Sequence, residues 1–416
     1  IKDHKVPGLA IAIVQDGKVI HAKGYGLRNV EKNLPVTANT LFAIGSISKS
    51  FTCTVLGILN DQGKLDWDKP VRDYLPDFRL HDSVATERMT PRDLVTHRSG
   101  LPRHDAVWYG SSRTRKQMYE NLRYLEPSKD FRSNWQYNNL MFMTAGYLAG
   151  RLADLTWEDL VRQRIFLPLG MKSSNFSVTA SQKTADYALP YSKIKEEVKE
   201  IPFRNLDEIG PAGSINSHVE DMGQYVLLHL NRGKHGDKQI LSENNANQMQ
   251  SPQMAMPAGG GGGAQFTELG TSSYGLGWMV STYRGHKLVQ HGGGIDGFAA
   301  LLTFLPQDKF GMIVLTNMSG SPATTVVTHN VIDRLLSLDQ IAWNQRFKDL
   351  QKKGQAAAEE AKKKAASARK AGTKPSHELK EYAGEFEHPA YGVAKIETDK
   401  EDLKLSAAQT SLPFTA

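Results

Sequence analysis

The chain has 416 residues, of which 40% are hydrophobic and 23% charged, as is usual for a globular protein of one to three domains. No run of about 18 apolar residues occurs, so we expect no membrane span. The single cysteine, Cys53, excludes an internal disulfide framework. Most of the net charge of +7 lies between Lys352 and Lys374, where eight basic residues face two glutamates, so a nucleic-acid groove on the remaining chain is not expected.

The first 70 residues predict a β-hairpin followed by a buried helix. The apolar alternation of GLAIAIVQDGKVIHAKGYG, residues 8–26, surrounds Asp16-Gly17, a dipeptide typical of two-residue hairpin turns. The continuous apolar pattern from Phe51 to Leu59 predicts a buried helix that ends near Gly63.

From about Pro70 to Gln250 the pattern is mainly helical, and after Gln250 strand patterns return. The clearest helices are MFMTAGYLAGRLA (141–153) and WEDLVRQRIFLPLG (157–170), and the Gly259–Gly263 run predicts a flexible surface loop. The later strands are expected at 274–281, 286–294, 299–306 and 310–317, with a helix at 323–336.

This order favours one sheet built from the first and last thirds of the chain, with a helical region inserted between them. We therefore predict a main domain over residues 1–345, with its sheet part at 1–70 and 270–345 and its helical part at 71–269. The Ala/Lys-rich segment 346–375 has almost no large apolar residues and predicts a linker. Strand alternation resumes at 376–416, which predicts the opening strands of an incomplete β-domain.

The stretch FAIGSISKSFT contains Ser46 and Lys49 three positions apart at the junction of a loop and a helix. Residues at this spacing share a helix face, so the lysine amine can reach the serine hydroxyl and act as its base. The alternative is that Ser46 only caps the helix. The same spacing at Ser192/Lys195 and Ser367/Lys370 lies in charged, solvated segments, so the spacing alone does not decide.

Two further motifs belong to the argument. Tyr137 and Asn139 form a Tyr-x-Asn pair that can relay a proton and hold a substrate carbonyl or amide, although the same pattern occurs at Tyr119. His291 and Gly293 follow a short apolar strand, where glycines let a substrate backbone lie along the strand edge. A turn histidine is the alternative reading of His291.

In this order and spacing, the three motifs resemble those of the penicillin-recognising serine hydrolases, in the branch of class C β-lactamases, DD-peptidases, D-aminopeptidases and related esterases. The resemblance extends over roughly Val6 to Leu336. Further similar segments are LVTHRSGLP (94–102), IFLPLGM (165–171), GPAGSINSHVEDMGQY (210–225), YGLGW (274–278) and LTN (315–317).

The resemblance implies an α/β fold of the β-lactamase/transpeptidase type, with an antiparallel sheet flanked by helices, an inserted all-α domain, and the site between them. It implies that Ser46 is the nucleophile, Lys49 its general base and Tyr137 the proton relay to the leaving group. YAGEFEHPAYG (382–392) resembles a small C-terminal β extension, too short here to close a barrel. The other implied site residues are Asn139, His291 and Gly293 for substrate binding, and the backbone N–H groups of Ser46 and Gly294 for the oxyanion hole.

The third motif departs from the β-lactamase pattern. Antibiotic-hydrolysing members usually have Lys-Thr-Gly where this chain has His291-Gly292-Gly293. A histidine with an ordinary pKa of about 6.5 is mostly neutral at neutral pH, so the permanent cation and the hydroxyl that would hold a β-lactam carboxylate are both absent. This difference favours a peptidase, amidase or esterase.

The leading hypothesis is a serine hydrolase that forms an acyl-enzyme on Ser46 and cleaves amide or ester bonds, including those of peptides with D-amino acids. The alternatives are a true β-lactamase or DD-carboxypeptidase, and a non-catalytic sensing protein on the same fold. We expect no cofactor, metal or nucleic-acid partner, a small-molecule or peptide substrate, a structural His97 and a buried, inert Cys53. The oligomeric state stays open, and only the resemblance favours an extracytoplasmic or periplasmic location.

Overall fold

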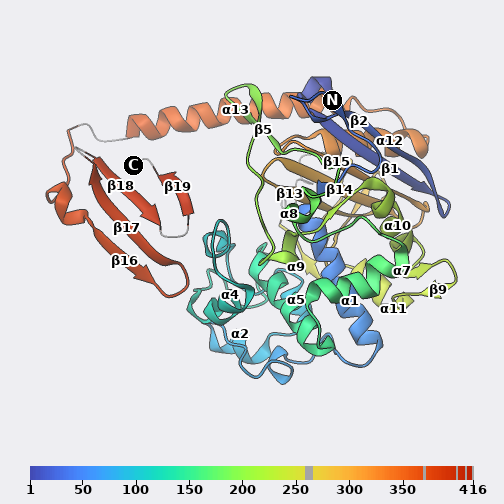
Figure 1. Ribbon diagram of the computed structural model, residues 1–416, viewed down its shortest axis with the longest axis horizontal. Helices are drawn as coiled ribbons and strands as arrows, with labels where there is room; N and C mark the ends of the chain where they lie inside the picture. Colours follow the sequence, from blue (N-terminus) through green and yellow to red (C-terminus); the bar gives the residue numbers. More distant parts are fainter. Residues whose placement is uncertain (258–265, 369–371, 400–401, 408–409, 415–416) are drawn as a thin grey trace. The chain divides into compact units, whose positions relative to one another are not determined.

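The computed structural model describes residues 1–257, 266–368, 372–399, 402–407 and 410–414 (Figure 1). The loop expected at Gly259–Gly263 therefore lies outside the described residues. Internal contacts divide the chain into two units, one of Ile1–Trp108 with Arg113–Thr324 and one of Tyr109–Ser112 with Thr325–Ala416. The first unit carries all the residues that the sequence places in a catalytic site.

The first unit is built on an antiparallel sheet to which both ends of the unit contribute, as the sequence predicts. Strand β1 pairs directly with β15, from Leu9 opposite Thr316 to Gln15 opposite Phe310. In the described residues the sheet has nine strands, in the order β10 (Met254–Ala255), β11 (Ser273–Tyr274), β12 (Met279–Tyr283), β13 (His286–Ile295), β14 (Phe298–Leu305), β15 (Phe310–Thr316), β1 (Gly8–Gln15), β2 (Lys18–Asn29) and β3 (Leu34–Pro35).

The β1–β2 connection is the tight turn that the sequence predicts. Asp16 and Gly17 both have positive φ, at 48° and 77°. Two consecutive positive φ angles define the hairpin turn whose twist matches the strands, and aspartate followed by glycine adopts them at low cost.

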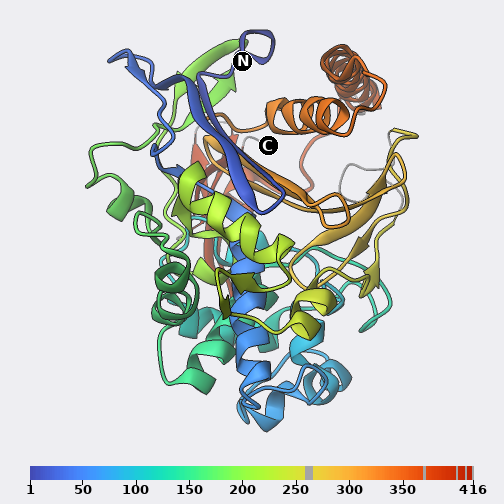
Figure 2. The same cartoon turned by 90° about the vertical axis from the view of Figure 1, so that its right-hand side faces the viewer.

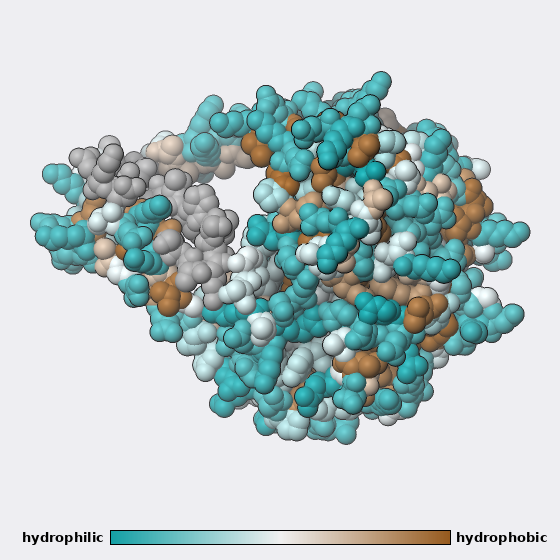
Figure 3. Space-filling model, in the orientation of Figure 1, coloured by the Kyte–Doolittle hydropathy of each residue, from teal (hydrophilic) through white to brown (hydrophobic). Residues whose placement is uncertain are grey.

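A helical region lies beside the sheet, and Figure 1 shows α1, α5 and α9 grouped below it. The helix α10 instead packs against β1, β2 and β15 (Figure 2). Around α2 and α4 the visible surface is mostly hydrophilic, as expected for the outer side of such helices (Figure 3). The helices are α1 (Ser48–Asp61), α2 (Ser83–Arg88), α3 (Pro91–Leu94), α4 (Arg115–Asn121), α5 (Asn139–Ala153), α6 (Trp157–Val161), α7 (Leu167–Leu169), α8 (Val178–Ser181), α9 (Gly210–Gly213), α10 (Val219–Leu230) and α11 (Glu243–Met249).

Two details of this region differ from the sequence expectation. The segment 157–170 is continuous, but a π-helical turn joins α6 to α7, and Pro168, which has no N–H to donate, follows this turn near the end of the helix. The charged segment 191–200, which contains Ser192 and Lys195, forms a hairpin within a region whose sequence pattern is mainly helical. The short strand pairs are β4 (Phe42–Ala43) with β7 (Asn216–Ser217), β5 (Tyr191–Ile194) with β6 (Glu197–Glu200), and β8 (Lys234–His235) with β9 (Lys238–Gln239).

In its described residues, the second unit contains most of α12, all of α13 and a separate sheet. The helix α12 (Ala323–Leu335) begins just before the division, and in the second unit the indole N–H of Trp343, at the start of α13 (Trp343–Ala368), donates to Asp333 over 2.8 Å. A short 3-10 turn, Leu379–Tyr382, precedes the sheet of β16 (Gly384–His388), β17 (Gly392–Asp399), β18 (Asp402–Ala407) and β19 (Thr410–Phe414). Among the described residues, no helix is both long and apolar enough to cross a membrane.

We propose that the Ala/Lys-rich segment is a linker, and we expect trypsin to cut it first. Every residue from Gln351 to Ala368 is exposed, and a helix without buried contacts opens at low free-energy cost. Limited digestion followed by intact-mass measurement should show first cleavages between Lys352 and Lys374. First cleavages before Leu335 would contradict this boundary.

Candidate active site

Ser46 lies in a 3-10 turn, Gly45–Ile47, that leads directly into α1. Every other residue from Leu41 to Leu59 is buried, whereas Ser46 is partly exposed. The preceding segment is held to the region around Ile215, whose carbonyl accepts from the Ile44 N–H over 3.0 Å. Ser46 is therefore the one residue of this segment whose hydroxyl solvent or a substrate can reach.

Lys49 lies one turn after Ser46, with its amine fully enclosed. Its Nζ lies 3.1 Å from Ser46 Oγ, 2.8 Å from Asn139 Oδ1 and 2.8 Å from the carbonyl oxygen of Ala212. Burial lowers the pKa of Lys49 well below its ordinary value, and the nearby positive charge of Arg103 lowers it further.

These contacts fix where the amine's lone pair can point. The carbonyl oxygens of Asn139 and Ala212 only accept hydrogen bonds, so each takes one N–H of the amine. Asn139 Nδ2 donates to Asp105 Oδ1 over 3.2 Å, which turns Oδ1 of the amide toward Lys49. In the neutral amine the lone pair is then left facing the Ser46 hydroxyl, which is the arrangement of a nucleophile with its general base.

Tyr137 and Asn139 are held at the start of α5. Asn138 caps this helix, with its side chain accepting from the Met141 N–H over 2.9 Å and donating to the Pro102 carbonyl over 2.6 Å. The Tyr137 ring centroid lies 4.7 Å from Lys49 Nζ. Burial raises the pKa of Tyr137 above its ordinary value and outweighs the hydrogen bond with Ser46, which lowers it, so the side chain stays a phenol and can donate a proton.

The glycines of β13 bring its backbone against the turn that carries Ser46. A Cβ atom on Gly293 would collide with the Ile44 carbonyl oxygen, and one on Gly45 would lie 2.7 Å from the Gly294 nitrogen. The strand β12 pairs with β13 only as far as Gln290, so in the described residues His291–Ile295 pair with β14 alone. A free strand edge therefore runs beside Ser46.

His291 is brought to the site but is 1% exposed. Its Nδ1 lies 2.6 Å from the Gly292 carbonyl, so Nδ1 carries the proton, and Nε2 then accepts from the Tyr274 hydroxyl over 2.8 Å. Burial lowers the pKa of His291 to about 3, helped by the charge of Lys49. The ordinary pKa assumed from sequence is therefore wrong, and the imidazole is neutral throughout the physiological range.

The structure adds two charged residues that the sequence analysis did not single out. Arg103 lies with its guanidinium carbon 5.1 Å from the Tyr137 ring centroid, and its Nε donates to Asp105 Oδ2 over 2.6 Å. Asp105 in turn accepts from Asn139 and, over 2.9 Å, from the indole of Trp108. Both residues follow the LVTHRSGLP segment closely. This position beside a family-like segment was the one sequence feature that could have pointed to a role in the site.

His97 and Cys53 are both buried. His97 packs with its ring centroid 4.3 Å from that of Tyr137, and its Nδ1 accepts from the Asn138 N–H over 3.0 Å. His97 thus holds the Tyr-x-Asn segment in place through one ring contact and one hydrogen bond. Burial raises the pKa of the Cys53 thiol well above its ordinary value, so the thiol stays protonated and unreactive.

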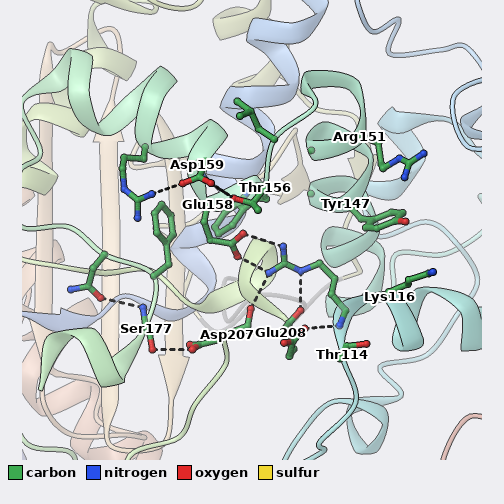
Figure 4. A pocket seen from close by; sticks show the side chains of 18 of the residues that line it. Thr114, Lys116, Tyr147, Arg151, Thr156, Glu158, Asp159, Ser177, Asp207 and Glu208 are labelled. Atoms are coloured by element: carbon green, nitrogen blue, oxygen red, sulfur yellow. Dashed lines mark hydrogen bonds and ion pairs between the residues drawn. The ribbon is translucent and has the colours of Figure 1, made fainter.

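A separate cavity of about 720 Å³ lies among α4, α5, α6 and α8 (Figure 4). Ser46, Lys49, Tyr137 and Asn139 do not line it. Its main cation, Arg115, is satisfied by Glu158 at 2.6 Å and by the Asp207 carbonyl at 2.9 Å. Within the residues described, no group of three or more His, Cys, Asp or Glu side chains could hold a metal ion.

The fold and this arrangement define the class of serine hydrolases with a β-lactamase/transpeptidase-like fold. The chain belongs to the Beta-lactamase family, whose model matches residues 1–335. A second model, a domain of unknown function named DUF3471, matches residues 368–415. The protein is therefore a serine hydrolase that acts on amide or ester bonds, as the sequence predicted.

Relatives of known name support this membership. The chain is 30% identical to unguisins hydrolase ungD' of Aspergillus campestris, over 95% of this chain and 75% of that protein. It is also 28% identical to unguisins hydrolase ungD of Aspergillus violaceofuscus, over 100% of this chain and 78% of that protein.

Solved structures show the same fold. The octameric penicillin-binding protein homologue from Pyrococcus abyssi matches with a TM-score of 0.71 and 25% identity, over 99% of this chain and 86% of that one. The D-amino acid amidase from Ochrobactrum anthropi matches with a TM-score of 0.62 and 22% identity, over 76% and 88%. A class C β-lactamase from Rhodobacter sphaeroides matches with a TM-score of 0.65 and 22% identity, over 81% and 97%.

If Lys49 is the base, the rate of Ser46 acylation should rise with pH through the lowered pKa of Lys49. Replacing Arg103 by Gln removes a positive charge that lowers this pKa, so the midpoint should move to higher pH. Replacing Asp105 by Asn removes a negative charge that raises it, so the midpoint should move to lower pH. The measurement is the pH dependence of fluorophosphonate labelling. Unmoved midpoints, or shifts in the same direction, would exclude Lys49 as the titrating group.

Proposed function

We propose that this hydrolase forms an acyl-enzyme on Ser46 and cleaves amide bonds of small peptides or amino-acid amides, including those with D-residues. One observation carries the proposal. The single partly exposed hydroxyl of a buried segment lies 3.1 Å from a lysine amine whose pKa burial lowers. A helix-capping serine needs no such partner, because its hydroxyl would instead accept from a backbone N–H of its own helix.

In the proposed acylation, Ser46 Oγ attacks the substrate carbonyl carbon while its proton passes to Lys49 Nζ. The backbone N–H groups of Ser46 and Gly294 stabilise the oxyanion. Tyr137, kept protonated by its raised pKa, donates its proton to the leaving nitrogen and recovers one from Lys49. A water molecule, activated by the reverse proton transfers, then hydrolyses the ester and regenerates the free serine.

The substrate class rests on the strand edge and on the relatives. Among the residues that the structure describes, nothing pairs with β13 on its second side at His291–Ile295, and such an edge suits an extended peptide, whose backbone can add to the sheet. Asn139, with its amide already shared between Lys49 and Asp105, borders the same site. The names of the matching proteins, unguisins hydrolase and D-amino acid amidase, make amide bonds of peptides and D-amino acids the first choice.

Two of the alternatives, a β-lactamase and a non-catalytic sensor, are supported less well. A β-lactamase of this family would use a cation in the third motif, whereas His291 is neutral and buried. A non-catalytic sensor needs neither a nucleophile nor a base, yet the chain keeps Ser46, Lys49 and Tyr137 in contact. We therefore propose that the backbone of the glycines after His291 binds the substrate. The His291 imidazole holds the strand in place through its hydrogen bond with Tyr274.

Ser46→Ala should reduce turnover of any amide substrate by about a thousandfold or more, because the covalent route is lost. It should also abolish fluorophosphonate labelling while the melting temperature stays close to that of the wild type. The measurements are steady-state kinetics and intact mass after labelling.

Ser50→Ala is the matched control for this experiment. Ser50 lies about one turn after Ser46, within α1, but it is fully buried and its hydroxyl donates to the Ile47 carbonyl over 2.8 Å. This variant should keep its labelling and activity. Wild-type turnover by Ser46→Ala would refute the proposed nucleophile.

A substrate panel tests the proposed specificity. We expect p-nitroanilides of D-amino acids to be cleaved with a kcat/KM at least about tenfold above that of their L-counterparts, since a chiral pocket discriminates by a few contacts. The chromogenic β-lactam nitrocefin should be hydrolysed more slowly than the best anilide. A kcat/KM for nitrocefin above that of every anilide and ester would favour the β-lactamase alternative instead.

A further inference from the structure

The helix α9 ends early, after the four residues Gly210–Gly213. A further turn would need the Ile215 N–H to donate to the Pro211 carbonyl. The Ile215 N–H instead donates to Ser48 Oγ, on α1, over 3.1 Å. The Pro211 carbonyl is therefore left without an N–H partner in its own helix.

The same holds for the next carbonyl of α9, that of Ala212. Its helical partner would be the Asn216 N–H, which donates to the Asn175 carbonyl over 2.9 Å. The Ala212 carbonyl can therefore accept from Lys49 Nζ at 2.8 Å. The acceptor that helps to orient the proposed base is one that a longer helix would have used itself.

Thr52 donates to the other of these two carbonyls. Its Oγ1 donates to the Pro211 carbonyl over 2.7 Å, whereas its distance to the Ser48 carbonyl of its own helix is 3.5 Å. Thr52 is 0% exposed, so solvent does not reach this hydroxyl. Because Lys49 and Thr52 lie three positions apart on one face of α1, this helix binds two consecutive carbonyls of α9 side by side.

Pro211 also packs directly against α5. A Cβ atom on Gly146 would lie 2.3 Å from Cβ and Cγ of the Pro211 ring, so the ring fits only against a glycine at this position. The same helix begins with Asn139, whose side chain is the second carbonyl acceptor of Lys49. Pro211 thus joins the two helices on which Lys49 and Asn139 lie.

We propose that Thr52 is a positioning residue for the proposed base, because its hydrogen bond to Pro211 holds α9 where the Ala212 carbonyl accepts from Lys49. This inference rests on the proposed function, since it concerns Lys49 as the base that activates Ser46. Without the Thr52 hydroxyl, the buried Pro211 carbonyl would lack a donor, and the backbone of α9 would shift to find another. The Ala212 carbonyl would move with it, because the two carbonyls belong to consecutive residues.

The test compares Thr52→Val with the wild type by fluorophosphonate labelling of Ser46 over a series of pH values. Valine keeps the shape of the side chain and removes the hydroxyl. A carbonyl acceptor stabilises an ammonium more than a neutral amine, so a weaker Ala212 contact should move the midpoint of labelling to lower pH. The limiting rate above this midpoint should fall about tenfold, because the lone pair is no longer held toward Ser46. Thr52→Ala should behave like Thr52→Val, and Thr52→Ser should restore the wild-type profile.

Thr54→Val provides the matched control. Thr54 lies on the same helix and is also 0% exposed, but its hydroxyl donates to the Ser50 carbonyl over 2.9 Å and lies 3.0 Å from the Tyr225 hydroxyl. Neither partner belongs to α9. This variant should lower the melting temperature by a similar amount and keep both the midpoint and the limiting rate of labelling.

A wild-type midpoint and rate in Thr52→Val, the same changes in Thr54→Val, or no recovery in Thr52→Ser would each overturn the proposal. Labelling retained by Ser46→Ala, or a wild-type labelling rate that does not change with pH, would instead refute the proposed nucleophile or base, so the two failures are distinguishable. The ionisable groups that act on Lys49 or lie around it are unchanged in all these Thr52 and Thr54 variants: Arg103, Asp105, Cys53, His97, Tyr137 and His291.

Discussion

The site depends on the three hydrogen bonds of the buried Lys49 amine. This amine joins three separate segments, since its partners come from the turn before α1, from the start of α5 and from α9. A charged ammonium buried in this way would cost several kcal/mol without a counter-ion, and its nearest acceptors are neutral. The neutral amine satisfies the same acceptors with two N–H groups and keeps its lone pair for Ser46. The requirement for packing and the requirement for a base thus lead to the same protonation state.

The second constraint is the close approach of two backbones far apart in the sequence. The turn with Gly45 and the strand with Gly293 and Gly294 touch where any side chain at Gly293 would collide with Ile44. This contact is possible because β1 pairs with β15, which places the last third of the chain beside the first. An oxyanion hole made from both segments can therefore exist only after the sheet has closed. Catalytic geometry and long-range topology are coupled at this point.

The sequence predicted what depends on local pattern. Alternation placed the strands at 286–294 and 299–306 within one residue of β13 and β14, and motif spacing identified the residues that meet at Ser46. It could not reveal Arg103, because its link to Tyr137 joins two loops without any periodicity. Nor could it reveal the low pKa of His291, which results from burial against Tyr274. The hairpin at 191–200 was not predicted, because the segment is mostly charged and lacks the apolar alternation that indicates paired strands.

The distribution of charge around Ser46 separates two tasks. Of the groups proposed to transfer protons, Lys49 is fully buried and Tyr137 is partly buried, and desolvation favours the neutral form of each. The neutral amine of Lys49 is free to accept the Ser46 proton, and dipoles that are already oriented around it stabilise the charge that this transfer creates. The ion pair of Arg103 and Asp105 instead lies at a partly exposed position, where solvent limits its desolvation cost. The ion pair therefore sets the charge around Lys49 and Tyr137 without itself taking up or releasing a proton, which is how one arrangement divides the two tasks.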